Sequence, residues 1–145
     1  MPSKITMHKI ENIIAAAQST GTSFSKAMRG RILSIKILYT NTTPANSSDR
    51  DTNIYEMNPS APTTISKAMQ EILDIGGLGV APDDDNNVYY PRIDAQDLTG
   101  AVQYYNDESN EPVKIPFMVF GILMLSVTAA AVGDITTAYV MVEEY

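Results

Sequence analysis

The sequence predicts a mainly β protein: an antiparallel β-sandwich or jelly-roll-like barrel with one or two short helices and an N-terminal helical arm. Short β-branched or alternating apolar segments recur between polar loops, roughly every ten to fifteen residues. The chain has 145 residues, 44% hydrophobic and 19% charged, which suits one folded domain and argues against disorder. We therefore divide it into a basic amphipathic arm, residues 1–29, and a single β-sandwich domain, residues 30–145.

The arm is predicted to be helical between His8 and Thr20. Four apolar residues recur there at the i, i+3, i+4 and i+7 spacing of one helix face, namely Ile10, Ile13, Ile14 and Ala17. Gly21 would end this helix. Because so short a helix is marginal alone in water, we expect the apolar stripe to be buried against a neighbouring subunit.

The first half of the domain should contain strands and a second helix. Arg31–Tyr39 is predicted as a strand because apolar residues alternate along it, and a short strand is expected at Asn53–Met57. Thr63–Ile75 carries an apolar stripe at helical spacing and ends at Gly76-Gly77, which predicts a helix. Further short strands are expected at Val88–Ile93 and Thr99–Tyr105.

The C-terminal apolar block admits two interpretations. Residues 115–133 form a nineteen-residue stretch without charge, long enough for a transmembrane helix. Pro116 and Gly121 fall in its first turns, however, and the segment after it is rich in β-branched residues. We therefore favour a hairpin with strands Phe117–Thr128 and Ile135–Glu143, covered by core on one side and by a helix or partner chain on the other. A small membrane protein with a span at 115–133 is the alternative.

Charge is divided unevenly along the chain. Residues 1–40 hold six basic residues and one acidic residue, whereas residues 41–145 hold four basic and sixteen acidic ones. The basic segment could contact an internal membrane or nucleic acid, or be ordinary solvated surface; the candidate contacts are Lys4, Lys9, Lys26, Arg29 and Arg31. The acidic remainder argues against nucleic-acid binding by the whole domain. The first thirty residues show no secretory signal pattern.

Few residues in the sequence suggest a catalytic or metal-binding site. The chain has no cysteine and one histidine, His8, so thiolate nucleophiles and paired imidazoles are excluded. Asp83, Asp85 and Asn87 have the spacing of a calcium loop, but Val88 replaces its glycine, and a solvated acidic turn is the alternative. We therefore predict no enzyme, no cofactor and no small-molecule substrate.

Aromatic residues suggest contact surfaces. Tyr89–Tyr90 and Tyr104–Tyr105 are adjacent pairs, so each pair would point one ring to each face of a strand. Tyrosine is enriched at protein interfaces, and together with Phe117 and Phe120 these rings are candidate subunit contacts. A ligand-binding β-sandwich module, with tyrosines as its platform, is a second alternative.

The order of segments carries a family resemblance. A basic arm leads into the strand GRILSIKILYTN at residues 30–41, and residues 115–144 give strand, small-residue turn and strand, IPFMVFGILMLSVTAAAVGDITTAYVMVEE. In this order the chain resembles small single β-barrel, jelly-roll-like virion coat proteins of tailless, membrane-containing double-stranded DNA phages. The resemblance implies a structural capsid subunit, made in the host cytoplasm and located in the virion. Its partners would be copies of itself and other virion proteins, with the arm reaching a neighbour or the inner face.

Overall fold

The computed structural model describes residues 2–40, 50–76, 87–96, 98–104 and 111–145. This part of the chain is mainly β and contains one 3-10 turn, Ile65–Lys67. Its strands are β1 (Lys4–Ile13), β2 (Gly21–Phe24), β3 (Met28–Thr40), β4 (Asp51–Met57), β5 (Ala68–Gly76), β6 (Asn87–Tyr89), β7 (Arg92–Asp94), β8 (Lys114–Pro116), β9 (Met118–Gly121), β10 (Leu123–Thr128) and β11 (Ile135–Glu144). The predicted mainly β, antiparallel class is confirmed.

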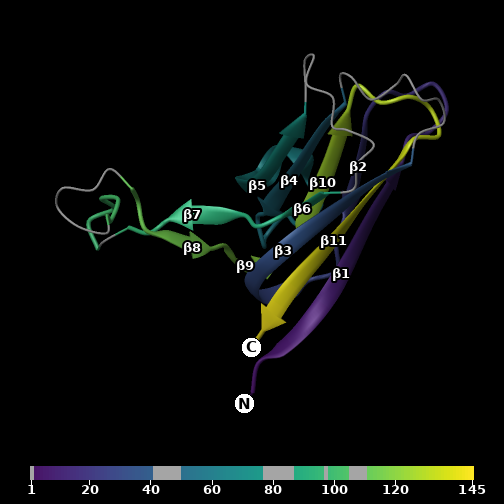
Figure 1. The fold of residues 1–145 in the computed structure, drawn as a ribbon. Helices are drawn as coiled ribbons and strands as arrows, with labels where there is room; N and C mark the ends of the chain where they lie inside the picture. Colours follow the sequence, from purple (N-terminus) through teal and green to yellow (C-terminus); the bar gives the residue numbers. More distant parts are fainter. Residues whose placement is uncertain (1, 41–49, 77–86, 97, 105–110) are drawn as a thin grey trace.

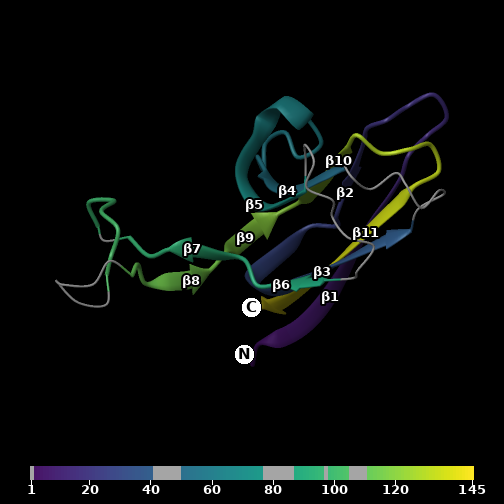
Figure 2. The ribbon, with the colours of Figure 1, turned by 45° about the horizontal axis from the view of Figure 1, so that its top comes forward.

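Two antiparallel sheets form the body, which curls into a half-barrel (Figure 1). The first sheet has the order β1-β11-β3-β6, and β9 also pairs with β3. The second sheet has the order β2-β10-β4-β5. The short strands β7 and β8 pair with each other as a separate ribbon that leaves the body, which is seen from a second direction in Figure 2.

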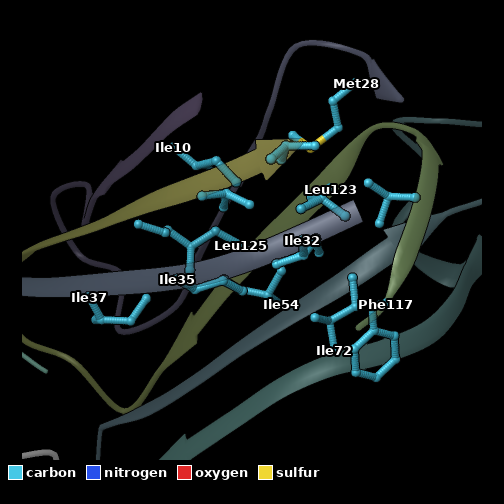
Figure 3. Packing of buried hydrophobic residues seen from close by; sticks show 14 of the residues in the cluster. Ile10, Met28, Ile32, Ile35, Ile37, Ile54, Ile72, Phe117, Leu123 and Leu125 are labelled. Atoms are coloured by element: carbon cyan, nitrogen blue, oxygen red, sulfur yellow. The ribbon is translucent and has the colours of Figure 1, made fainter. Parts of the chain in front are cut away.

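The core lies between the two sheets (Figure 3). Ile32, Ile35 and Ile37 of β3 are fully buried, and the register against β11 shifts between Met141 and Val142, so Ile32 and Ile35 both face inward although they are three residues apart. They meet inward residues of the second sheet, including Ile54 and Leu125. The strand predicted over Arg31–Tyr39 is confirmed, but at its start the bulge buries Ile32 in place of Leu33, which simple alternation would have turned inward.

A buried ion pair joins the starts of two strands from different sheets. Arg50 precedes β4 and Asp134 precedes β11, and the Arg50 Nη2 atom lies 2.5 Å from the Asp134 Oδ2 atom. The Arg50 side chain is 0% exposed and that of Asp134 1% exposed. The guanidinium also lies over the Tyr39 ring, 5.1 Å from its centroid. This pair therefore ties the two sheets together at one end.

The predicted N-terminal helical arm is wrong. Residues 4–13 form β1, which pairs with β11 along its whole length, from Lys4 opposite Glu144 to Ile13 opposite Ile135. Ile10 and Ile14 face the core while Ile13 faces outward, which is strand alternation rather than a helix stripe. The intervening inward residue is Asn12, whose amide donates to the Ser23 hydroxyl of β2. A polar residue at a core position hid the period of two.

The predicted helix at Thr63–Ile75 is also wrong. Beyond the 3-10 turn, the segment is strand β5, paired antiparallel with β4. The register between them shifts twice, at Ile54/Tyr55 and at Glu56/Met57. Such irregularities break the simple alternation of inward residues, so the apolar positions also fitted a helical period.

The C-terminal block is extended, but it is not the predicted hairpin. Residues 115–133 contribute to β8, β9 and β10, and no helix within the described ranges has the length and apolar character to cross a bilayer. β10 pairs with β2 and β4, whereas β11 pairs with β1 and β3. The connection through residues 129–134 therefore passes from one sheet to the other, and the apolar residues of both strands meet across the core.

Candidate self-association surface

A two-stranded ribbon projects from the body and is the most distinctive surface feature (Figures 1 and 2). Its strands β7 and β8 are held by the pairing of Arg92 with Pro116, Ile93 with Ile115 and Asp94 with Lys114. Further out, backbone hydrogen bonds of 2.8–2.9 Å link Ala95, Gln103 and Val113. A two-stranded ribbon on its own is marginally stable in water, and here the segment around Gln103 adds hydrogen bonds to its outer part.

The ribbon is amphipathic. On one face Ile93 and Ile115 lie directly opposite each other, 36% and 43% exposed. On the other face the Lys114 ammonium forms an ion pair with the Asp94 carboxylate. Leu98, further along the ribbon, is fully exposed. An apolar face left open on a thin ribbon is a surface that a partner would cover.

A second apolar surface lies on the outer face of the first sheet. Side chains at outward positions of β1, β11, β3 and β6 stand side by side, because Met7 is opposite Met141 and Lys36 is opposite both Tyr139 and Val88. They surround a shallow groove of about 410 Å³. Met7, Val88 and Met141 are all exposed. The sequence indicated none of these as contact residues.

The predicted interface residues divide into three groups. Ile10, Ile14 and Phe117 belong to this subunit's own core, so the expectation that a neighbour buries them is corrected. Tyr89 packs partly buried against that core. The remaining described residues of the set are exposed: Ile13, Ala17, Tyr90, Tyr104 and Phe120. Tyr105, like Asp83 and Asp85 of the suggested calcium loop, lies outside the described residues.

The five basic residues predicted as polyanion or lipid contacts differ in their surroundings. Lys4, Lys9, Lys26 and Arg29 are exposed, and Lys9 and Lys26 border one hollow of about 240 Å³. Arg29 lies over the Phe120 ring, 5.6 Å from its centroid. Arg31 forms an ion pair with Glu143, which raises the pKa of Arg31, first through the hydrogen bond and then through the opposite charge. Arg31 is therefore engaged within the subunit.

The paired ends of β1 and β11 also place a titratable group. His8 Nε2 lies 2.7 Å from one Glu144 oxygen, and the Thr6 hydroxyl donates to the other at 3.0 Å. These hydrogen bonds, with His8 first, lower the pKa of Glu144 below its ordinary value of 4.5. A carboxyl group of this kind stabilises the fold above its unfolded-state pKa, and the contribution disappears as the pH falls through the folded-state pKa.

We expect the free energy of unfolding to decrease as the pH falls below about 4.5, the ordinary pKa of Glu144. Glu144→Gln should make that decrease shallower, because the substituted side chain cannot titrate. Urea denaturation at a series of pH values measures both proteins. If the two pH profiles run parallel, Glu144 is not a source of the acid sensitivity.

Within the described ranges, no three His, Asp or Glu side chains are grouped so as to hold a metal ion. In comparisons with known proteins, no family model, no curated protein and no solved structure matched the chain.

Proposed function

We propose that the chain is a structural coat subunit that assembles with copies of itself, without catalysis. The observation that carries the proposal is the projecting amphipathic ribbon, whose apolar face is formed by Ile93 and Ile115. A thin ribbon with an open apolar face has little to stabilise it within one subunit. A neighbouring subunit would bury this apolar face. Repetition of the same contact from subunit to subunit would build a shell or a lattice.

The resemblance in the order of segments supports a virion setting for this assembly. In that setting the subunit is part of the capsid and meets other virion proteins as well as its own copies. The exposed basic residues Lys4 and Lys26 would then face an internal membrane or nucleic acid. The half-barrel body would act as the rigid unit, and the ribbon as its contact with the neighbour.

Burial of the apolar face of the ribbon would favour association. Full burial of an exposed isoleucine side chain contributes about 1.5–3 kcal/mol, and Ile93 and Ile115, which are 36% and 43% exposed, can each add part of that gain. A standard interface buries about 1,600 Å² in total, so residues beyond this pair would have to take part. Part of this gain offsets the entropy lost on association, so buried area alone does not set the affinity.

The test is to replace the apolar face of the ribbon while keeping its strand propensity. In the variant Ile93→Thr/Ile115→Thr, β-branched residues are retained but the apolar contact is lost. We expect its association to weaken by about 100-fold or more, as measured by sedimentation velocity and light scattering over a concentration series. The body should remain folded, as measured by circular dichroism.

The matched control changes the opposite face of the same two strands. Asp94→Asn/Lys114→Gln removes the exposed ion pair, which contributes little, and should assemble like the wild type. Wild-type protein that stays monomeric at high concentration would refute the proposed function. If Ile93→Thr/Ile115→Thr assembles as well as the wild type, the apolar face of the ribbon is not the contact between subunits.

A further inference from the structure

The strand β1 forms an open edge of the first sheet. Within the described part of the chain it pairs with β11 alone, and Figure 1 shows it at the outer side of that sheet. It runs for ten residues, Lys4 to Ile13, with no proline or glycine. A long regular edge carries a row of backbone groups that can pair with another strand.

The direction of these backbone groups follows from the hydrogen bonds just beyond β1. The Ile14 N–H donates to the Asp134 carbonyl, and the Gly133 N–H donates to the Ile14 carbonyl. Bonded residues alternate along an antiparallel pair, so the even-numbered residues of β1 bond toward β11. The backbone groups of Met7, Lys9, Glu11 and Ile13 therefore point toward the open edge.

The same odd-numbered residues place their side chains on the outer face of the sheet. Met7 and Ile13 are 60% and 57% exposed. Between them, the Lys9 ammonium lies 3.4 Å from the Glu11 carboxylate. Among the outward-facing residues, those before Ile10 are the positive Lys9 and then the apolar Met7. Those after Ile10 are the negative Glu11 and then the apolar Ile13.

We propose that β1 pairs antiparallel with β1 of a second copy, about a two-fold axis through Ile10. In this register Lys9 of each copy lies opposite Glu11 of the other, and Met7 lies opposite Ile13. Directly opposed charges of opposite sign and directly opposed apolar residues both stabilise an antiparallel pair. The contact is the same from both sides, as two-fold symmetry requires.

The pattern also disfavours neighbouring registers. A slip of two residues in one direction puts Lys9 against Lys9 of the second copy, and in the other direction Glu11 against Glu11. Like charges directly opposite each other are destabilising. A slip of one residue would turn every side chain of one strand to the wrong face of the joined sheet. The charges of Lys9 and Glu11 therefore select one partner strand and one register.

The inference rests on the proposed function, since both take a second copy of this chain as the partner. It adds a contact at the edge of the body that is separate from the ribbon. Two subunits joined in this way would share one continuous sheet, and the outer groove beside Met7 would gain Ile13 of the second copy.

Charge reversal tests whether Lys9 and Glu11 of two copies meet, and cysteine cross-linking tests the register. Lys9→Glu places two carboxylates opposite each other at both symmetric positions, and Glu11→Lys places two ammonium groups opposite each other there. We expect each variant alone to lose edge pairing by about tenfold or more. An equimolar mixture of the two variants should recover wild-type affinity, because each opposed pair in the mixed dimer joins an acid of one chain to a base of the other.

In the proposed register, every opposed pair of the mixed dimer at positions 9 and 11 carries opposite charges. The chain with Lys9→Glu carries acids at both positions 9 and 11, and the chain with Glu11→Lys carries bases at both. Each of the two opposed pairs in the mixed dimer therefore joins one acid to one base. Mixing cannot repair damage within either chain, so recovery reports the contact between copies.

One control and one cross-linking test accompany the charge reversal, and the control is measured by sedimentation velocity in the background of the Ile93→Thr/Ile115→Thr ribbon variant. Lys67→Glu makes the same charge change at an exposed residue of the 3-10 turn before β5, which belongs to the second sheet, and should leave the pairing intact. The chain has no cysteine, so disulfide trapping has no background. Chains carrying Met7→Cys mixed with chains carrying Ile13→Cys should cross-link on oxidation, since opposed Cα atoms in a bonded pair are about 5.5 Å apart. Met7→Cys alone should not, because the two copies of residue 7 would be roughly 20 Å apart.

The outcomes separate this inference from the proposed function. Failure of the mixture to recover affinity, or no cross-link between the two cysteine variants, overturns the edge pairing while ribbon-dependent assembly of the wild type stands. Association of Lys9→Glu alone at wild-type strength overturns it as well. A wild-type protein that never associates overturns both proposals together.

Discussion

Replacing Asp134 by alanine is expected to lower the free energy of unfolding by about 3–5 kcal/mol. The carboxylate is almost completely buried against Arg50, whose side chain is fully buried. The variant must bury the Arg50 guanidinium charge without the Asp134 carboxylate or open the structure around it. The substitution also removes the acceptor for the Ala131 N–H, which lies 3.0 Å from Asp134 Oδ2.

Urea denaturation at neutral pH measures this loss, and two variants assign its cause. Asp134→Asn keeps an oxygen for the Ala131 N–H but loses the charge, so it should fall between the wild type and the alanine variant. In Arg50→Met/Asp134→Ala both charges are gone, and stability should recover relative to Asp134→Ala alone. A double variant that loses the sum of two large single effects would show that the buried guanidinium charge is not the cause.

Local patterns identified strands whose inward residues are mostly apolar or β-branched. The segments predicted at Arg31–Tyr39, Asn53–Met57 and Ile135–Glu143 correspond to β3, β4 and β11. The pattern failed in β1, where the polar Asn12 takes an inward position, and in β5, whose register against β4 shifts twice. At such places helix and strand periods both fit a short sequence.

The pairing of strands depends on residues far apart in the chain. Six residues separate β10 from β11, a length that would also suit a hairpin, yet the two strands belong to different sheets. The candidate surfaces could not be predicted from the sequence for the same reason, because they also depend on which distant residues are paired. Ile93 and Ile115 are individually ordinary apolar residues, and only their opposition on a projecting ribbon makes them a contact face. Likewise, Lys9 and Glu11 become candidate contacts between two copies only because β1 is an edge strand.

Replacing Gly30 by alanine is the second change with a large expected effect, a loss of about 3–5 kcal/mol in the free energy of unfolding. Gly30 lies in β3 between two paired strands, opposite Glu144 of β11 and Val119 of β9. Its φ of 155° is a conformation that other residues rarely adopt. A Cβ atom at this position would lie 2.1 Å from the backbone carbonyl oxygen of Glu143. Because that oxygen belongs to a paired strand, relief requires movement of the sheet rather than of a side chain.

Gly121→Ala separates the clash from the backbone strain. Gly121 lies in β9 and also has a positive φ, 130°, but a Cβ atom there would meet nothing within 4 Å. Its replacement should therefore cost only the strain, about 1–3 kcal/mol. Urea denaturation of both variants gives the difference between the two losses, which measures the close approach of β3 to β11. If both variants lose the same free energy, the strands can separate at Gly30 without cost, and the tight contact between them does not stabilise the first sheet.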